Sequence, residues 1–186
     1  MEGSMASNPA VSANPVVRFF QSPEWLGRAG LLGFVTCASL LATAYYFEYY
    51  LFMDPCPLCM VQRLAFLLIG LGCLAVFLTR QRVGLRLAAL AFTVAASVFG
   101  FWSADHHIWI QNLPADEVPD CGPSFDYLMD TLPVSELLKI MLQGDGNCAE
   151  ISWSMWGLSM PEWTRIWYGG FVLVVGLAFI SNLRRR

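Results

Sequence analysis

Four long segments of this chain contain no charged side chain, and this feature restricts the possible folds most strongly. They are Ala29 to Phe47, Leu64 to Thr79, Leu87 to Ala104 and Ile166 to Leu183. Most are close to the roughly 20 residues that an α-helix needs to cross a hydrocarbon core of about 30 Å. The composition agrees, because 56% of the residues are hydrophobic, only 13% are charged and the mean hydropathy is +0.53. The sequence therefore predicts an all-α membrane protein.

The second segment reaches full length if its helix begins at Pro57 and Arg63 extends its charge to the membrane surface. We therefore expect one four-transmembrane-helix bundle over residues 29–183. Residues 1–28 are expected to be a largely disordered tail, because their first part is rich in Ser, Asn, Pro and Ala. The expected spans lie near 29–51, 57–79, 86–105 and 163–183, with loops at 52–56 and 106–162 and a basic end at 184–186.

The basic residues are distributed unevenly about these spans, which predicts the orientation of the chain. Eight of them flank one side of the expected bundle: Arg18, Arg28, Arg80, Arg82, Arg86, Arg184, Arg185 and Arg186. That side is expected to be cytoplasmic and to carry both termini, which places loops 52–56 and 106–162 outside. No basic patch indicates a nucleic-acid partner.

The long outer loop contains two apolar patterns at helical spacing, separated by Pro133. The first comprises Phe125, Leu128, Met129 and Leu132, and the second comprises Leu137, Leu138, Met141 and Leu142. Two short amphipathic helices would bury these faces. They could lie along the membrane surface or pack on the bundle, and the pattern favours neither.

The six cysteines divide by position into two outer pairs and two buried single residues. Cys56 and Cys59 begin the second span, and Cys121 and Cys148 lie in the outer loop. Cys37 and Cys73 lie inside the first two spans, where apolar packing explains them without a redox role.

The Cys56-Pro57-Leu58-Cys59 motif is expected to be reactive because of its place at the start of a helix. Pro57 suits the first helical position, which makes Cys56 the N-cap and sets Cys59 near the positive end of the helix dipole. Arg63, four residues after Cys59, adds a positive charge that favours a Cys59 thiolate. A structural disulfide or half of a zinc site is the alternative. No metal is expected, because a four-cysteine zinc site needs two closely spaced pairs.

Cys121 and Cys148 allow two interpretations. Alone, they predict an ordinary structural disulfide in an oxidising compartment. Beside a reactive dithiol on the same side of the membrane, they indicate a relay that exchanges disulfides with that dithiol and with a soluble protein.

Several motifs together resemble the DsbB family, the quinone-dependent disulfide bond formation proteins of bacteria. They are the Pro-Cys-Pro-Leu-Cys run with Arg63 four places on, the loop pair, the run 147–150 (Asn-Cys-Ala-Glu) and the run 156–163 (Trp-Gly-Leu-Ser-Met-Pro-Glu-Trp). The resemblance covers nearly all of the chain beyond the N-terminal tail. One departure is Gln62, which precedes Arg63 where some family members carry an acidic residue.

The resemblance implies a multi-pass protein of the bacterial inner membrane, with both termini cytoplasmic. It would reoxidise a soluble periplasmic thioredoxin-fold partner of the DsbA type and pass the electrons to a membrane quinone, either ubiquinone or menaquinone. Cys121 would accept attack from the partner and Cys148 would be displaced. Exchange would then reduce Cys56 and Cys59, and Cys59 beside Arg63 would meet the quinone.

Two other functions fit part of the pattern. A vitamin K epoxide reductase homologue also has four spans, a loop pair and a CxxC motif, but its loop pair precedes the CxxC motif and here it follows. A non-catalytic membrane protein could use both pairs as structural disulfides. His106 and His107 are expected to be interfacial hydrogen-bonding residues rather than proton relays.

Overall fold

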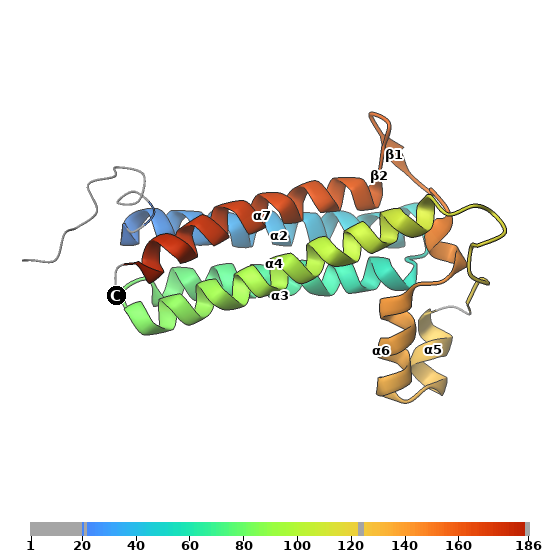
Figure 1. The fold of residues 1–186 in the computed structure, drawn as a ribbon, viewed down its shortest axis with the longest axis horizontal. Helices are drawn as coiled ribbons and strands as arrows, with labels where there is room; N and C mark the ends of the chain where they lie inside the picture. The colour runs from blue at the N-terminus through green and yellow to red at the C-terminus, as the bar shows by residue number, and fades with distance from the viewer. Residues whose placement is uncertain (1–19, 21, 123–124, 185–186) are drawn as a thin grey trace, which may run out of the picture.

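The computed structural model describes residue 20 and residues 22–122 and 125–184. Four long helices run side by side along the longest axis of the molecule (Figure 1). They are α2 (Pro23–Leu51), α3 (Pro57–Thr79), α4 (Val83–Gln111) and α7 (Met160–Leu183), and all four are long and apolar enough to cross a membrane. The predicted four-helix fold class is therefore confirmed.

The α2, α4 and α7 helices extend beyond their expected spans, whereas α3 has the expected bounds. Local capping, rather than charge, decides where α2 and α7 begin. The α2 helix starts at Pro23, within the expected tail, where the Trp25 amide donates to the Ser22 hydroxyl at 3.4 Å. The α7 helix starts at Met160 behind a capping box formed by Ser159 and Glu162. The part of the expected tail at residues 1–19 lies outside the described residues.

Consecutive long helices pack together, α2 on α3, α3 on α4 and α4 on α7. Small residues allow the close approaches, as is common where helices associate in lipid. A Cβ atom on Gly100 would lie 2.5 Å from the Tyr168 ring, so the α4–α7 contact requires glycine there. Cys37 and Cys73 lie in the same apolar core, beside Ala65 and Ile69.

Two short helices join α4 to α7, as the apolar patterns predict. They are α5 (Phe125–Thr131) and α6 (Val134–Gln143), with Pro133 at the N-cap of α6. The pair projects crosswise from one end of the bundle (Figure 1), and Leu128 and Leu137 are buried.

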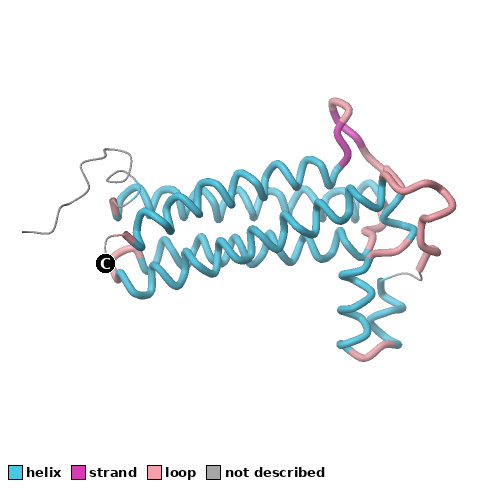
Figure 2. Tube along the Cα trace, viewed as in Figure 1, coloured by secondary structure: helices cyan, strands magenta, loops and turns pink. Residues whose placement is uncertain are grey.

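The loop after α6 holds a 3-10 helix, η1 (Gly146–Ala149), and a small antiparallel hairpin of β1 (Ser154–Met155) and β2 (Leu158–Ser159). Trp156 and Gly157 connect the strands with φ of 54° and 80°, the positive values that a tight hairpin turn needs. Figure 2 shows the hairpin at the same end of the bundle as α5 and α6. This end also carries the first turn of α3, so the CxxC motif and the outer loop meet there.

Candidate functional site

The CxxC motif forms the first turn of α3. Cys56 is the N-cap, and its Sγ accepts a hydrogen bond from the Cys59 amide at 3.4 Å. Pro57 occupies the start of the helix, where its missing N–H costs nothing. The sulfur that meets the free amides of the helix is thus that of Cys56, whereas the sequence argument had placed Cys59 there. The Cys56 thiol donates to Cys59 Sγ at 2.8 Å, and both cysteines are free.

Cys148 is brought to the same place by η1. The Asp145 carboxylate caps this short helix by accepting from the Asn147 amide at 3.1 Å, and the Cys148 amide donates to the Asp145 carbonyl at 3.0 Å. The Cys148 side chain is fully buried, in a cluster with Cys56, Leu58 and Ile110. One cysteine of the loop pair therefore lies directly against the CxxC motif.

The second loop cysteine, Cys121, is at the surface. Its side chain is exposed, and its segment lies beside η1, where the Gly146 amide donates to the Asp120 carbonyl at 3.2 Å. The Gly122 amide donates to the Asp145 carboxylate at 3.2 Å, so the same acidic residue holds both segments. The loop pair thus has one accessible and one buried sulfur.

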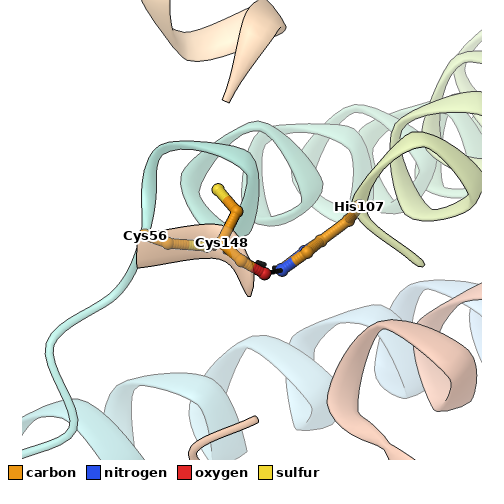
Figure 3. A group of neighbouring side chains, drawn as sticks. All are labelled: Cys56, His107 and Cys148. Atoms are coloured by element: carbon orange, nitrogen blue, oxygen red, sulfur yellow. Dashed lines mark hydrogen bonds between the residues drawn. The ribbon is translucent and has the colours of Figure 1, made fainter. Parts of the chain in front are cut away.

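His107 of α4 completes the cluster (Figure 3). Its Nε2 lies 3.8 Å from Cys56 Sγ and 3.1 Å from the Cys148 carbonyl oxygen. Its Nδ1 lies 3.1 Å from Gln62 Nε2, and Gln62 Oε1 accepts from the Thr164 hydroxyl at 2.7 Å. A polar network buried among α3, α4 and α7 therefore fixes the imidazole beside two sulfurs.

Hydrogen bonding within the cluster makes the two sulfurs unequal. The hydrogen bond that Cys148 accepts from Cys56 holds the pKa of the Cys148 thiol below its ordinary value. Hydrogen bonding with Cys148 and with Cys59, which share its single proton, together with burial raises the pKa of the Cys56 thiol well above its ordinary value. Cys148 is therefore the better leaving group and the readier thiolate of the two.

Arg63 points toward α2. Its guanidinium forms an ion pair with Glu48 and donates to the Ala44 carbonyl at 3.2 Å. It also lies over the Tyr45 ring, 5.1 Å from the centroid. The sequence argument paired this charge with Cys59, but among the described residues its ion pair is with Glu48.

A cavity of about 1170 Å³ opens among α2, α3, α7 and the outer loop. Cys56, Cys59, Arg63 and His107 all line it. Most of its remaining wall is apolar or aromatic, including Leu40, Phe47, Phe66, Met160, Trp163 and Trp167. Its size and lining suit a large, flat, mainly apolar ligand held by a few polar groups.

Sequence reasoning identified the cysteines and Arg63 but missed the other polar residues of this site, which are His107, Gln62 and Glu48. His107 was considered but assigned an interfacial role. Gln62 was a visible signal, because it is a lone amide in an apolar helix and is only 5% exposed. Glu48 was another, since it is the first charge after an uncharged segment.

Comparison with known proteins shows the family of this chain. The family model described as "Disulfide bond formation protein DsbB" matches residues 27–178. The chain is 45% identical to disulfide bond formation protein B of Marinobacter nauticus over 83% of this chain and 90% of the relative. It is 40% identical to disulfide bond formation protein B of Hahella chejuensis over 87% of this chain and 99% of the relative. It is 39% identical to disulfide bond formation protein B 1 of Pseudomonas aeruginosa over 83% of this chain and 93% of the relative. The chain, with its cysteine cluster at one end of four apolar helices, belongs to the DsbB family.

Proposed function

We propose that Cys121 and Cys148 collect electrons from a soluble thioredoxin-fold partner and that Cys56 and Cys59 deliver them to a quinone in the cavity. Proteins of the DsbB family are thiol oxidoreductases that reoxidise DsbA and pass its electrons to quinone. One observation carries the assignment of residues. Cys148 is buried against Cys56 at the cavity, while Cys121 is exposed.

The first step is attack by a partner thiolate on Cys121 Sγ of a Cys121–Cys148 disulfide. A mixed disulfide forms, the Cys121–Cys148 bond breaks and Cys148 leaves as a thiolate. The exposure of Cys121 gives the partner access. The lowered pKa of Cys148 supports its role as the leaving group, because a thiol of lower pKa leaves faster.

The second step moves the two electrons inward, from the loop pair to the CxxC pair. The Cys148 thiolate attacks Cys56 Sγ of a Cys56–Cys59 disulfide, which forms a Cys56–Cys148 bond and releases Cys59 as a thiolate lining the cavity. The partner's second thiolate then frees Cys121, which attacks Cys148 and releases Cys56. The loop disulfide is thus restored, and the two electrons reside on Cys56 and Cys59.

The residues around the cavity fit a quinone, which takes up two electrons and two protons as the Cys56–Cys59 disulfide reforms. Aromatic walls suit a flat ring, and the Arg63 guanidinium and the His107 imidazole offer polar contacts to ring oxygens. Both ubiquinone and menaquinone meet these requirements.

The proposed setting is the bacterial inner membrane, with the cysteine cluster on the periplasmic side and both termini cytoplasmic. Support comes from the charges, since Arg80, Arg82, Arg86 and Arg184 lie at the end of the helices remote from the CxxC motif. The α3–α4 connection and the last turn of α7 lie together at that end (Figure 1).

A quinone-reduction assay tests the proposal. Purified protein is mixed with a reduced thioredoxin-fold substrate and with ubiquinone or menaquinone in turn, and quinone absorbance is followed. Wild type is expected to reduce at least one quinone, and Cys59→Ala is expected to fall to the background rate because the electron-delivering sulfur is gone. Cys73→Ala is the matched control, because Cys73 lies in the apolar core away from the cavity lining. Undiminished reduction by Cys59→Ala would contradict the mechanism.

A further inference from the structure

We propose that Cys56, His107 and Cys148 form a binding site for Zn²⁺ whenever both thiols are reduced, and that a bound ion arrests disulfide exchange. The three residues come from the start of α3, from α4 and from η1. Their two Sγ atoms and the imidazole nitrogen all lie within 4.8 Å of one another. Figure 3 shows the three residues side by side, with the His107 ring directed at the Cys148 carbonyl oxygen.

The spacing is close to that of ligands on one ion. Zinc binds sulfur at about 2.3 Å and imidazole nitrogen at about 2.0 Å in tetrahedral geometry, which puts such a pair of ligands roughly 3.5 Å apart. Cys56 Sγ and His107 Nε2 are 3.8 Å apart. Small side-chain movements therefore suffice to close the site. Cys59, with Sγ 2.8 Å from Cys56 Sγ, is the nearest further sulfur for a fourth ligand.

The donor set and its burial select the kind of metal. Two thiolates and a neutral imidazole suit Zn²⁺, whereas Mg²⁺ and Ca²⁺ require oxygen ligands. His107 is 3% exposed and Cys148 is 0% exposed, in the apolar cluster with Leu58 and Ile110. These two ligands are thus shielded from competing water, while Cys56, 9% exposed, borders the cavity and leaves the ion a route of entry.

A hydrogen-bonded amide already orients the histidine, as zinc-bound histidines require. In the metal-free structure Nε2 donates to the Cys148 carbonyl oxygen at 3.1 Å, and this hydrogen bond is given up when Nε2 binds the ion. Nδ1 must then carry the proton and donate it to Gln62. A flip of the Gln62 amide provides Oε1 as the acceptor and turns its NH₂ toward Thr164, whose hydroxyl can accept as well as donate. Both hydrogen bonds of Gln62 are therefore retained in the metal-bound form.

Binding of the ion releases protons but transfers no electrons. Two Zn–S bonds form and two thiol protons are released, so the site exists only when neither sulfur is in a disulfide. The ion then occupies both the attacking sulfur, Cys148, and its target, Cys56. The arrest of exchange rests on the function proposed above, whereas the binding itself does not.

A search for paired zinc knuckles in the sequence could not find this set of ligands, because Cys148 and His107 are far from the CxxC motif along the chain.

Cobalt titration tests the site directly. Full-length protein in detergent is reduced with a phosphine, desalted without oxygen and titrated with Co²⁺, a spectroscopic probe of zinc sites. Reduced wild type is expected to give sulfur-to-cobalt charge-transfer and tetrahedral visible bands with one ion per chain, displaced by Zn²⁺. Oxidised wild type is the matched control and is expected to give none. Absence of these bands in the reduced protein would overturn the site, whatever the quinone assay shows.

Variants identify the ligands. Cys148→Ser and His107→Ala are expected to lose the bands, and Gln62→Ala is expected to weaken Zn²⁺ binding about 10- to 100-fold by releasing the imidazole. Cys121→Ser and Cys73→Ser are expected to bind normally. Unchanged bands in Cys148→Ser, a nearly isosteric change, would disprove the assignment even if His107→Ala failed to fold. Zinc binding that left quinone reduction unchanged would instead disprove the arrest.

Discussion

Individual sulfurs in this protein differ because their surroundings differ. Cys121 is exposed, while Cys148 is fully buried and accepts a hydrogen bond from Cys56. An exposed sulfur can meet another protein, and a buried one can meet only its neighbours. In the proposed mechanism, accessibility thus separates the residue that receives electrons from the residues that pass them on.

This separation predicts the behaviour of Cys121→Ser. Quinone reduction driven by a reduced thioredoxin-fold substrate is expected to fall to background, because the accessible sulfur is lost. Reduction driven by dithiothreitol is expected to persist, since a small thiol can reduce the Cys56–Cys59 pair without the loop. Both rates are read from quinone absorbance, with Cys37→Ser as the control. An equal loss of quinone reduction with both reductants would show that Cys121 is not the entry point for electrons from the partner.

At the scale of elements, α2 and α3 are joined near the cavity by a charged pair. The Glu48 and Arg63 side chains are 22% and 13% exposed, respectively, and the guanidinium also donates to the Ala44 carbonyl on α2. Leaving one charge of such a pair without its partner in a partly buried place is costly. The ion pair therefore holds the Arg63 side chain in place in the cavity wall.

A double-mutant cycle measures this link. Glu48→Gln and Arg63→Gln are each expected to lower the free energy of unfolding in detergent, and the double variant is expected to lose less than the sum. The coupling expected for a pair with this partial exposure is about 0.5–3 kcal/mol. Additive effects would mean that the pair contributes nothing to the α2–α3 contact.

The α4–α7 contact depends on a missing side chain. Gly100→Ala would drive a methyl group into the Tyr168 ring, whose hydroxyl donates to the Gln62 carbonyl at 2.7 Å. We expect a loss of about 1–3 kcal/mol in the free energy of unfolding, from overpacking. Gly176→Ala is the matched control, because nothing lies within 4 Å of its added Cβ, and it is expected to be neutral or slightly stabilising. Thermal unfolding in detergent compares the two, and equal melting temperatures would refute the steric argument.

The whole molecule is polarised along its long axis. The cysteine cluster, α5, α6 and the hairpin lie at one end, and the α3–α4 connection lies at the other (Figures 1 and 2). In a membrane, the cysteine cluster of such a bundle would lie on one side. The basic residues at the opposite end support the proposed periplasmic placement of the cluster.

Labelling with a membrane-impermeant maleimide tests the orientation. In cells with a permeabilised outer membrane, reduced Cys121 is expected to react, since it is exposed on the proposed periplasmic side. Arg82→Cys in a Cys121→Ser background is expected to react only after the inner membrane is broken. Reaction of Arg82→Cys in intact cells would reverse the proposed topology.

The sequence by itself determined the features that depend on neighbouring residues. Four uncharged segments required helices of membrane-spanning length, and Pro57 after Cys56 marked the start of α3. The apolar periods on both sides of Pro133 predicted α5 and α6. Helix bounds were less well predicted, because charges such as Asp105 mark where the apolar segment ends, while α4 continues to Gln111.

Only the tertiary structure decided which distant residues meet. Cys148 lies against Cys56, His107 bridges Cys56 to Gln62, and Arg63 turns to Glu48. Each of these contacts joins different elements, so it depends on how the helices pack and where the loop returns rather than on any local pattern. Spacing along the chain could identify the reactive dithiol, but packing alone could show which sulfur faces it and which groups surround the cavity.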